Sequence, residues 1–206
     1  MITEKQLTIF GVFAKEPFAE HTRKQIKKES KEKSNNGMAL VINLLKKEGV
    51  LIEKKVGKSG LLTLNMNNDL TFYYIALCNN ARTPHLAKQA IKILKEELDE
   101  DILFYSIVIF GSYAIGEQKQ TSDLDIAIFI ESEEKRKRIE AAINSAKLKI
   151  LVETDIHVIS SSEMIEMLTD KHENLGKQIA RKHLAVYNHQ IFYAIIKDGM
   201  KRGFRT

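Results

Sequence analysis

Cysteine, proline and long apolar runs are scarce in this 206-residue chain. The single cysteine, Cys78, excludes an intrachain disulfide and a cysteine-rich zinc site, and it fits a protein of the reducing cytoplasm. No run of about 18 apolar residues occurs, so we expect no membrane span. The first residues lack the cleavage pattern of a signal peptide, and we expect none. A composition of 44% hydrophobic and 29% charged residues is typical of a folded globular protein.

Positive charge is concentrated in the first third of the chain. Residues 1–70 contain 13 Lys and Arg against 8 Asp and Glu, a net charge of +5, whereas residues 71–206 contain 19 of each kind. A basic segment attracts polyanions, so this asymmetry favours a polyanionic partner for the first third and different chemistry for the rest. A merely solvated surface would show the same charges.

The first third is patterned as three helices and a hairpin. We predict helices at 3–15, 21–30 and 35–48, with Ser34 or Asn35 as the N-cap of the third, and strands at 50–56 and 61–66 around the turn GKSG. This order resembles the winged helix-turn-helix domains of prokaryotic regulators. The resemblance implies that the helix at 35–48 enters the major groove of DNA.

The same resemblance indicates which residues would contact DNA. The expected phosphate contacts come from the second helix and the tip of the hairpin, and they are Arg23, Lys24, Lys27, Lys28 and Lys58. Asn35 and Asn36, at the start of the third helix, are the expected base readers, although capping that helix is an equally good interpretation. Winged helices also serve as protein-docking or dimerisation modules.

The remainder of the chain alternates strands with helices. Helices are predicted at 69–80 and 85–100, the latter with an apolar stripe formed by Leu86, Ala90, Ile93, Leu94 and Leu98. Strands follow at 104–110, 123–130 and 152–160, with a helix at 131–147 before the third. Two helices, 174–188 and 190–200, close the chain, and we expect His183 in the first of them to face solvent. The pattern predicts a mixed sheet with helices packed on one face.

The sharpest motif lies between the first two of these strands. An apolar strand runs into Gly111 and Ser112, and Asp123 and Asp125 begin the next strand. Residues two apart on a strand point to the same face, so the two carboxylates repel each other unless a cation lies between them. The glycine permits close approach of a ligand, and the backbone N–H groups with the Ser112 hydroxyl suit phosphate oxygens. The motif predicts a site for a divalent metal and a nucleoside triphosphate.

A third carboxylate is expected from the strand at 152–160. Two-metal phosphoryl chemistry needs ligands that bridge the ions and a base near the nucleophile. Asp155 lies in an otherwise apolar stretch and is the first candidate, while Glu153 has the same parity and is its rival. His157, also in register, is expected to be a structural hydrogen-bonding group.

These residues resemble the nucleotidyltransferase superfamily related to DNA polymerase beta, especially its minimal prokaryotic members. The resemblance covers roughly residues 84–160, and it implies that Asp123, Asp125 and Asp155 are catalytic and hold the metal. It assigns the nucleotide-binding role to Gly111, Ser112, Gly116 and Ser122. The cofactor it implies is Mg²⁺ or Mn²⁺, with ATP as the first choice of triphosphate. Ile115 departs from the arginine that many members carry, and Lys119 is the candidate substitute.

Taken together, the patterns predict an α+β protein in three parts. A winged helix domain at 1–68 is followed by connecting helices at 69–100 and by a nucleotidyltransferase-fold domain with C-terminal helices at 101–206. The expected activity is transfer of a nucleoside monophosphate to an acceptor hydroxyl. By analogy the acceptor is a partner toxin protein in a toxin–antitoxin module, and the chain is a homodimer. The alternative is a DNA-binding regulator whose second domain senses nucleotide, or mediates assembly, without turnover.

Overall fold

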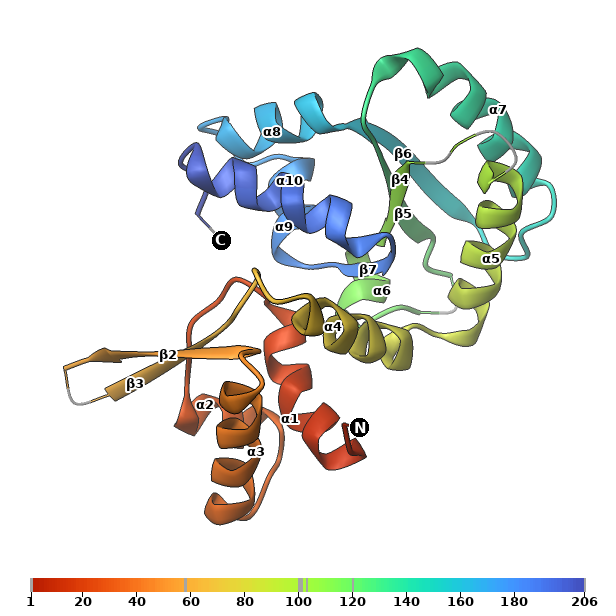
Figure 1. Cartoon of the computed structure of the whole chain (residues 1–206). Coiled ribbons are helices and arrows are strands. Elements are labelled where there is room, and N and C mark those ends of the chain that lie inside the picture. The colour runs from red at the N-terminus through yellow and green to blue at the C-terminus, as the bar shows by residue number, and fades with distance from the viewer. Residues whose placement is uncertain (1, 58, 100–101, 103, 120, 206) are drawn as a thin grey trace. The chain divides into compact units, whose positions relative to one another are not determined.

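The computed structural model describes residues 2–57, 59–99, 102, 104–119 and 121–205. By its contacts the chain divides into two compact units, Met1–Ala81 and Arg82–Thr206 (Figure 1). Within the described residues, none of the helices combines the length and the apolar character needed to cross a bilayer.

The first unit contains helices around a small antiparallel sheet. Its strands lie in the order β1-β3-β2, and β2 and β3 form a hairpin. The elements are α1 (Glu4–Lys15), β1 (His21–Thr22), α2 (Arg23–Glu29), α3 (Asn35–Lys47), β2 (Leu51–Val56), β3 (Ser59–Leu64) and α4 (Asp69–Arg82).

Side-chain caps determine where the first three helices begin. The hydroxyls of Thr3 and Thr22 each accept from the backbone of a glutamine three residues later, and that glutamine bonds back to the cap. Ser34 caps α3 by accepting from the Gly37 N–H at 3.0 Å. The predicted helix at 21–30 was therefore too long, because His21 and Thr22 pair with β3 before the helix begins.

The second unit is built on a four-stranded mixed sheet in the order β6-β5-β4-β7. The strands β5 and β6 are parallel, whereas β4 runs antiparallel to both β5 and β7. The elements are α5 (His85–Asp99), β4 (Tyr105–Ile109), α6 (Gly111–Ile115), β5 (Leu124–Ile130), the 3₁₀ turn η1 (Glu133–Lys135), α7 (Arg136–Lys147), β6 (Thr154–Ser160), α8 (Ser161–Thr169), α9 (Leu175–Arg181), β7 (Leu184–Tyr187) and α10 (His189–Lys201).

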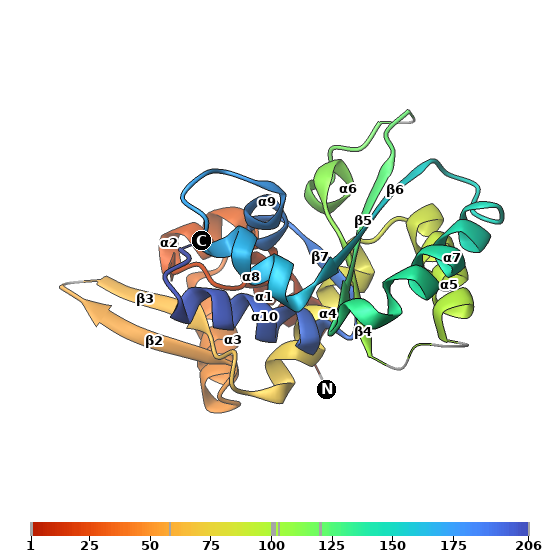
Figure 2. The ribbon, with the colours of Figure 1, turned by 90° about the horizontal axis from the view of Figure 1, so that it is seen from above.

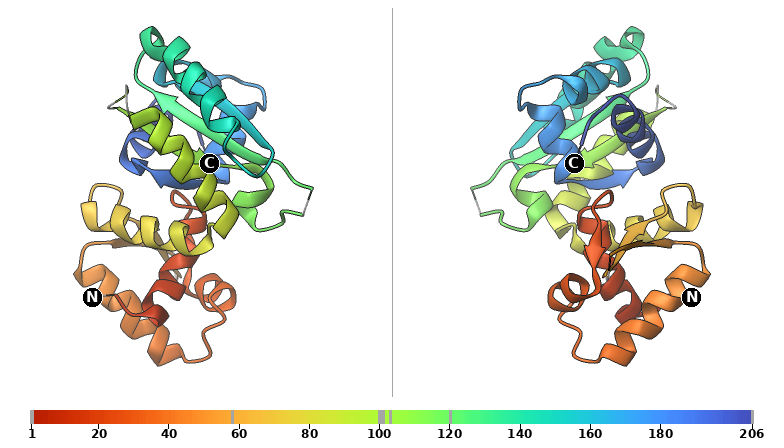
Figure 3. Two further views of the ribbon diagram at one scale, coloured as in Figure 1. Left: turned by 90° about the vertical axis from the view of Figure 1, so that its right-hand side faces the viewer. Right: turned by 90° about the vertical axis from the view of Figure 1, so that its left-hand side faces the viewer.

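Helices cover both faces of this sheet, which corrects the expectation of a single covered face. On one face Ile107, Ile126 and Ile128 share a core with α5 and α7, which lie side by side (Figure 3). On the other face the Phe129 ring packs on Phe192 of α10, with centroids 5.0 Å apart. Figure 2 shows the two helix layers on either side of the strands. The two central strands, β4 and β5, are buried on both faces, which explains their continuous apolar sequences.

The helix predicted at 174–188 was wrong in its second half. Helix α9 ends at Arg181, and the next residues form β7, where Ala185 pairs with Val108 of β4. A short apolar run such as LAVY fits a buried helix or a strand equally well, and the open edge of β4 decides for the strand. His183, expected to face solvent, is only 2% exposed.

The predicted apolar stripe of α5 is rotated in the structure. Ala90, Leu94 and Leu98 are buried as expected, but Leu86 is 48% exposed, and Ala87 takes its place in the core. Leu86 is left on the surface beside the candidate site.

Candidate functional site

The turn after β4 brings the backbone against a carboxylate. Gly111 has φ +63°, and a Cβ at this position would lie 2.9 Å from Cγ of Asp125 and still closer to its Oδ2. The Phe110 N–H donates to the Asp125 carbonyl at 3.0 Å, which holds the turn beside the start of β5. A side chain at position 111 would therefore be strained and would collide with Asp125.

Helix α6 after this turn is a single short turn of helix. It ends at Ile115, followed by the C-cap Gly116 with φ +77°, and the Ser112 carbonyl accepts from the N–H groups of Gly116 and Glu117. Because α6 is so short, its dipole is weak. Any phosphate held here depends mainly on individual N–H groups and on the half-buried Ser112 hydroxyl.

The three predicted aspartates gather at the ends of two neighbouring strands. Asp125 pairs in register with Asp155 across the parallel strands β5 and β6, and Asp123 lies two residues before Asp125. Partial burial raises the pKa of the Asp125 carboxyl above its usual value, and the charges of Asp155 and Asp123 raise it further. The three carboxylates thus lie close enough to repel one another.

Asp155 and its rival Glu153 occupy different places. Asp155 is exposed, and its Oδ2 lies 3.1 Å from Nε2 of His157, which also faces the Phe110 ring. Glu153 precedes β6, and its carbonyl accepts from the Leu124 N–H at 2.9 Å. Of these two carboxylates, Asp155 is the one whose charge raises the pKa of Asp125. The hydrogen bond of His157 agrees with the interpretation of this residue as a hydrogen-bonding partner.

The carboxylates suit a divalent cation by their chemistry, although they do not form a ready-made cage. In the described part of the chain, no group of three His, Cys, Asp or Glu side chains is arranged to hold a metal ion. Asp155 is directed to His157, while burial first and the charges of Asp155 and Asp123 second raise the pKa of the Asp125 carboxyl. Hard oxygen ligands and unrelieved like-charge repulsion are the features that Mg²⁺ or Mn²⁺ satisfies.

A cavity of about 760 Å³ is lined by one of the three aspartates, Asp123. Its polar lining includes Lys119, Ser122 and Asp123, and the Ser122 Oγ accepts from the Lys119 N–H at 2.9 Å. This size lies within the range of small-molecule sites. The remaining lining residues are Pro84, His85, Leu86, Tyr113, Gln118, Thr121, Leu151, Val152 and Glu153. Sequence patterns could not reveal the role of α5 here, because its first turn reaches the cavity only through the tertiary fold.

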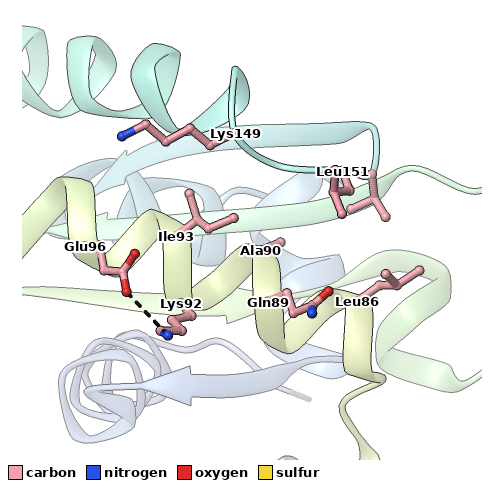
Figure 4. Close-up of a pocket in the computed structure, with 9 residues that line it drawn as sticks. Leu86, Gln89, Ala90, Lys92, Ile93, Glu96, Lys149 and Leu151 are labelled. Carbon is pink, nitrogen blue, oxygen red and sulfur yellow. Dashed lines mark ion pairs between the residues drawn. The ribbon is translucent and has the colours of Figure 1, made fainter.

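A second hollow, of about 290 Å³, continues the apolar side of this cavity (Figure 4). It lies between α5 and the α7–β6 connection and shares Leu86, Leu151 and Val152 with the larger cavity. Leu151 and the nearby Leu148 are 86% and 90% exposed. On the strand β6, His157 lines a third cavity, of about 580 Å³, together with residues of α8.

The basic residues of the first unit differ in how far they are already engaged. Arg23 donates to Glu53 at 3.2 Å, and Lys27 donates to Asn35 at 2.6 Å. Lys24, Lys28 and Asn36 are exposed. Lys58, predicted at the tip of the hairpin, lies outside the described residues.

Comparison with known proteins identifies the second unit. Residues 88–204 match the model of the nucleotidyltransferase domain family. The chain belongs to this family. The nucleotidyltransferase domain predicted from the Gly-Ser and Asp-x-Asp motifs is thereby confirmed, and the mixed sheet agrees with it.

Two curated relatives come from Methanocaldococcus jannaschii. One, named "Putative protein adenylyltransferase MJ1215", is 54% identical over 41 residues, which are 20% of this chain and 48% of the relative. The other, "Putative protein adenylyltransferase MJ0126", is 51% identical over 41 residues, which are 20% of this chain and 42% of the relative. The chain thus spans about half the length of the curated relatives it matches. No solved structure matches the chain.

Proposed function

We propose that this protein is a nucleotidyltransferase that depends on Mg²⁺ or Mn²⁺ and moves a nucleoside monophosphate from ATP to an acceptor hydroxyl. The observation that carries the proposal is the contact between a glycine turn and paired carboxylates. Gly111 lies against Asp125, and Asp155 lies beside Asp125 on the next strand. Membership of the nucleotidyltransferase family supports the same reaction class.

The aspartates and the turn would divide the work. Asp123, Asp125 and Asp155 would hold the divalent ions, which when bound neutralise the triphosphate and polarise the reacting phosphate. Gly111 and Ser112 would hold phosphate oxygens through backbone N–H groups and the hydroxyl. Gly116 and Ser122 would shape the loop beside the nucleotide, where Lys119 supplies the cation that Ile115 does not.

In the proposed reaction one bond forms and one breaks at the α-phosphorus. The acceptor oxygen bonds to this phosphorus, and the bond to the pyrophosphate oxygen breaks. The acceptor proton passes to a nearby base, for which Asp155 is our candidate. His157, 3.1 Å away, would position that carboxylate and tune its basicity. Pyrophosphate leaves with the electron pair of the broken bond.

A protein hydroxyl is the proposed acceptor. The curated relatives carry the name protein adenylyltransferase, and Leu151, which is 86% exposed and lines the large cavity, offers apolar surface to a macromolecule. A partner toxin protein is the acceptor suggested by analogy with minimal nucleotidyltransferases. We also propose that the protein is a homodimer, as expected from its sequence.

For the first unit we propose a winged helix that binds DNA. Three helices followed by the β2–β3 hairpin fit that fold, and the unit carries the whole net charge of +5. The phosphate contacts would come from Arg23, Lys24, Lys27, Lys28 and Lys58, and base contacts from the first turn of α3. DNA binding and nucleotidyl transfer would then coexist in one chain, as in an antitoxin that represses its own operon.

The decisive experiment separates binding from turnover. Calorimetry with ATP, GTP, CTP or UTP and Mg²⁺ measures binding without any acceptor. Incubation of the whole protein and a cell extract with α-labelled or γ-labelled ATP then distinguishes nucleotidyl from phosphoryl transfer. Compared with extract alone, we expect the added protein to increase protein-bound label from α-labelled ATP and not from γ-labelled ATP. Tight binding with no transfer of label would instead support a nucleotide-sensing regulator.

A further inference from the structure

The helix α3 presents a narrow face that its packing does not explain. Met38, Val41, Ile42 and Leu45 are buried in the first unit. The spacing of four, three and four residues places another set on the opposite face, where every member is exposed, namely Asn36, Leu40, Asn43 and Lys47. Leu40 lies at the middle of this set and is 71% exposed. The stripe therefore offers one apolar group between two amide side chains to a partner.

The two asparagines of this stripe are available to a ligand. Ser34 serves as the N-cap of α3, and Asn35 accepts from Lys27. Over the described residues, no hydrogen bond is recorded for the side chains of Asn36 and Asn43. An asparagine amide has one acceptor and two donor hydrogens, which match the edge of adenine in the major groove.

The chemistry of the stripe matches one kind of base pair. Asparagine pairs with the N6 and N7 atoms of adenine, and an apolar side chain contacts the 5-methyl group of thymine. Guanine is read mainly by arginine or lysine, and the only such residue on this face is Lys47 at the last turn of α3. We propose that α3 reads A·T base pairs, with Asn36 and Asn43 on adenines and Leu40 on a thymine methyl group. The inference rests on the DNA binding proposed above for this unit.

The surrounding charge favours DNA over a protein partner for the same face. Lys27 of α2 is bonded to Asn35, so the basic helix α2 lies beside the start of α3. Lys24 and Lys28 of α2 are exposed. Cations beside a polar helix face suit phosphates flanking a groove, whereas a protein-docking face of this size would be expected to carry more apolar residues.

Three synthetic duplexes of one length test the reading with the whole protein. The first has a mixed A·T core, the second has deoxyuridine in place of each thymidine in that core, and the third has an inosine·cytosine core. Deoxyuridine removes only the methyl groups, whereas inosine keeps an A·T-like minor groove but presents a guanine-like major groove. We expect the first duplex to bind about tenfold tighter than the third. The second should lie between them.

Two leucine variants locate the methyl contact. Leu40→Ala should bind the thymine and uracil duplexes with equal affinity, because the side chain that senses the methyl group is gone. Leu148→Ala, which changes a leucine of the second unit that is 90% exposed, should keep the full difference. A circular dichroism melt of each variant checks that the fold is intact.

The possible failures point to different errors. Equal binding of the thymine and inosine duplexes would overturn the reading of A·T pairs by α3. The proposed DNA binding itself would remain. No binding of any duplex at low salt would overturn the proposed DNA-binding function and the reading with it. A Leu40→Ala protein that still distinguishes thymine from uracil would remove Leu40 from the interface.

Discussion

The two units of this chain use charge in opposite ways. The first carries a net charge of +5 with its exposed lysines spread along α2, while the second has equal numbers of acidic and basic residues. Yet the second unit is where like charges are forced together, since Asp125 lies beside Asp155 in register. The net charge of a unit therefore determines which charged partners it attracts at long range. A local chemical site depends instead on where the fold brings a few charged side chains together.

The largest expected effect would follow from removing a central carboxylate. Asp125→Asn should reduce label transfer from α-labelled ATP by about 100-fold or more, because it removes a proposed metal ligand. Binding of duplex DNA should not change, since Asp125 belongs to the second unit. Glu140→Gln, an exposed carboxylate on α7, is the matched control. Unchanged transfer by a folded Asp125→Asn protein would remove this residue from the active site.

A pair of glycine variants would sharpen the role of the turn. Both Gly111 and Gly116 have positive φ, so alanine strains either position by about 1–2 kcal/mol. Only Gly111→Ala would also press against Asp125, because nothing lies within 4 Å of a Cβ at Gly116. Nucleotide binding by calorimetry should therefore fall much further in Gly111→Ala than in Gly116→Ala. Equal losses would mean that backbone strain, rather than contact with Asp125, is what matters.

A third prediction concerns the stability of the second unit against acid. Burial lowers the pKa of His183 to about 4, and the neutral ring bonds to the Ile179 carbonyl and the Tyr193 hydroxyl. The unfolded chain, with a histidine pKa near 6.5, binds more protons between about pH 6.5 and 4, so stability falls as the pH drops through this window. Between pH 7 and pH 5 the loss should be about 2 kcal/mol.

Urea unfolding at the two pH values measures this loss. His183→Phe should be less stable at pH 7 because it lacks both hydrogen bonds, but its stability should change less on acidification. His172→Gln, which replaces an exposed histidine, should keep the acid sensitivity of the parent protein. If the parent and His183→Phe lose the same stability between pH 7 and pH 5, the buried ring is not the source of the effect.

The smallest effect concerns individual lysines of the first unit. Lys24→Ala and Lys28→Ala should each lower the slope of log affinity against log salt for duplex DNA by about one, with no effect on nucleotide transfer. Arg23→Ala should change the slope less, because Arg23 is already paired with Glu53. Lys137→Ala on α7 is the control. If none of the first-unit variants alters the salt slope, these residues do not contact DNA phosphates, and the proposed difference between the two units is wrong.

Secondary-structure elements with a regular hydrophobic pattern, and the short motifs, could be predicted from the sequence itself. The helices capped by Thr3 and Ser34, the hairpin, and the strands around Gly111 and Asp125 follow from periodicity, caps and turn residues, which are local properties. The nucleotidyltransferase domain was also recognisable, because Gly111, Ser112, Asp123 and Asp125 resemble the motif of that family. These features depend on neighbours within a few residues.

Other features required the tertiary structure, because they depend on partners distant in the chain. The segment after Arg181 is a strand only because β4 offers an edge, and His183 is buried only because α10 packs over it. The register that places Asp155 beside Asp125 and the cavity between the first turn of α5 and Asp123 likewise arise from assembly. Local sequence determined which residues were available for chemistry. Packing decided which of them meet. A short apolar run becomes a strand or a helix, and a single polar residue becomes buried or exposed, according to the elements that the fold packs against it.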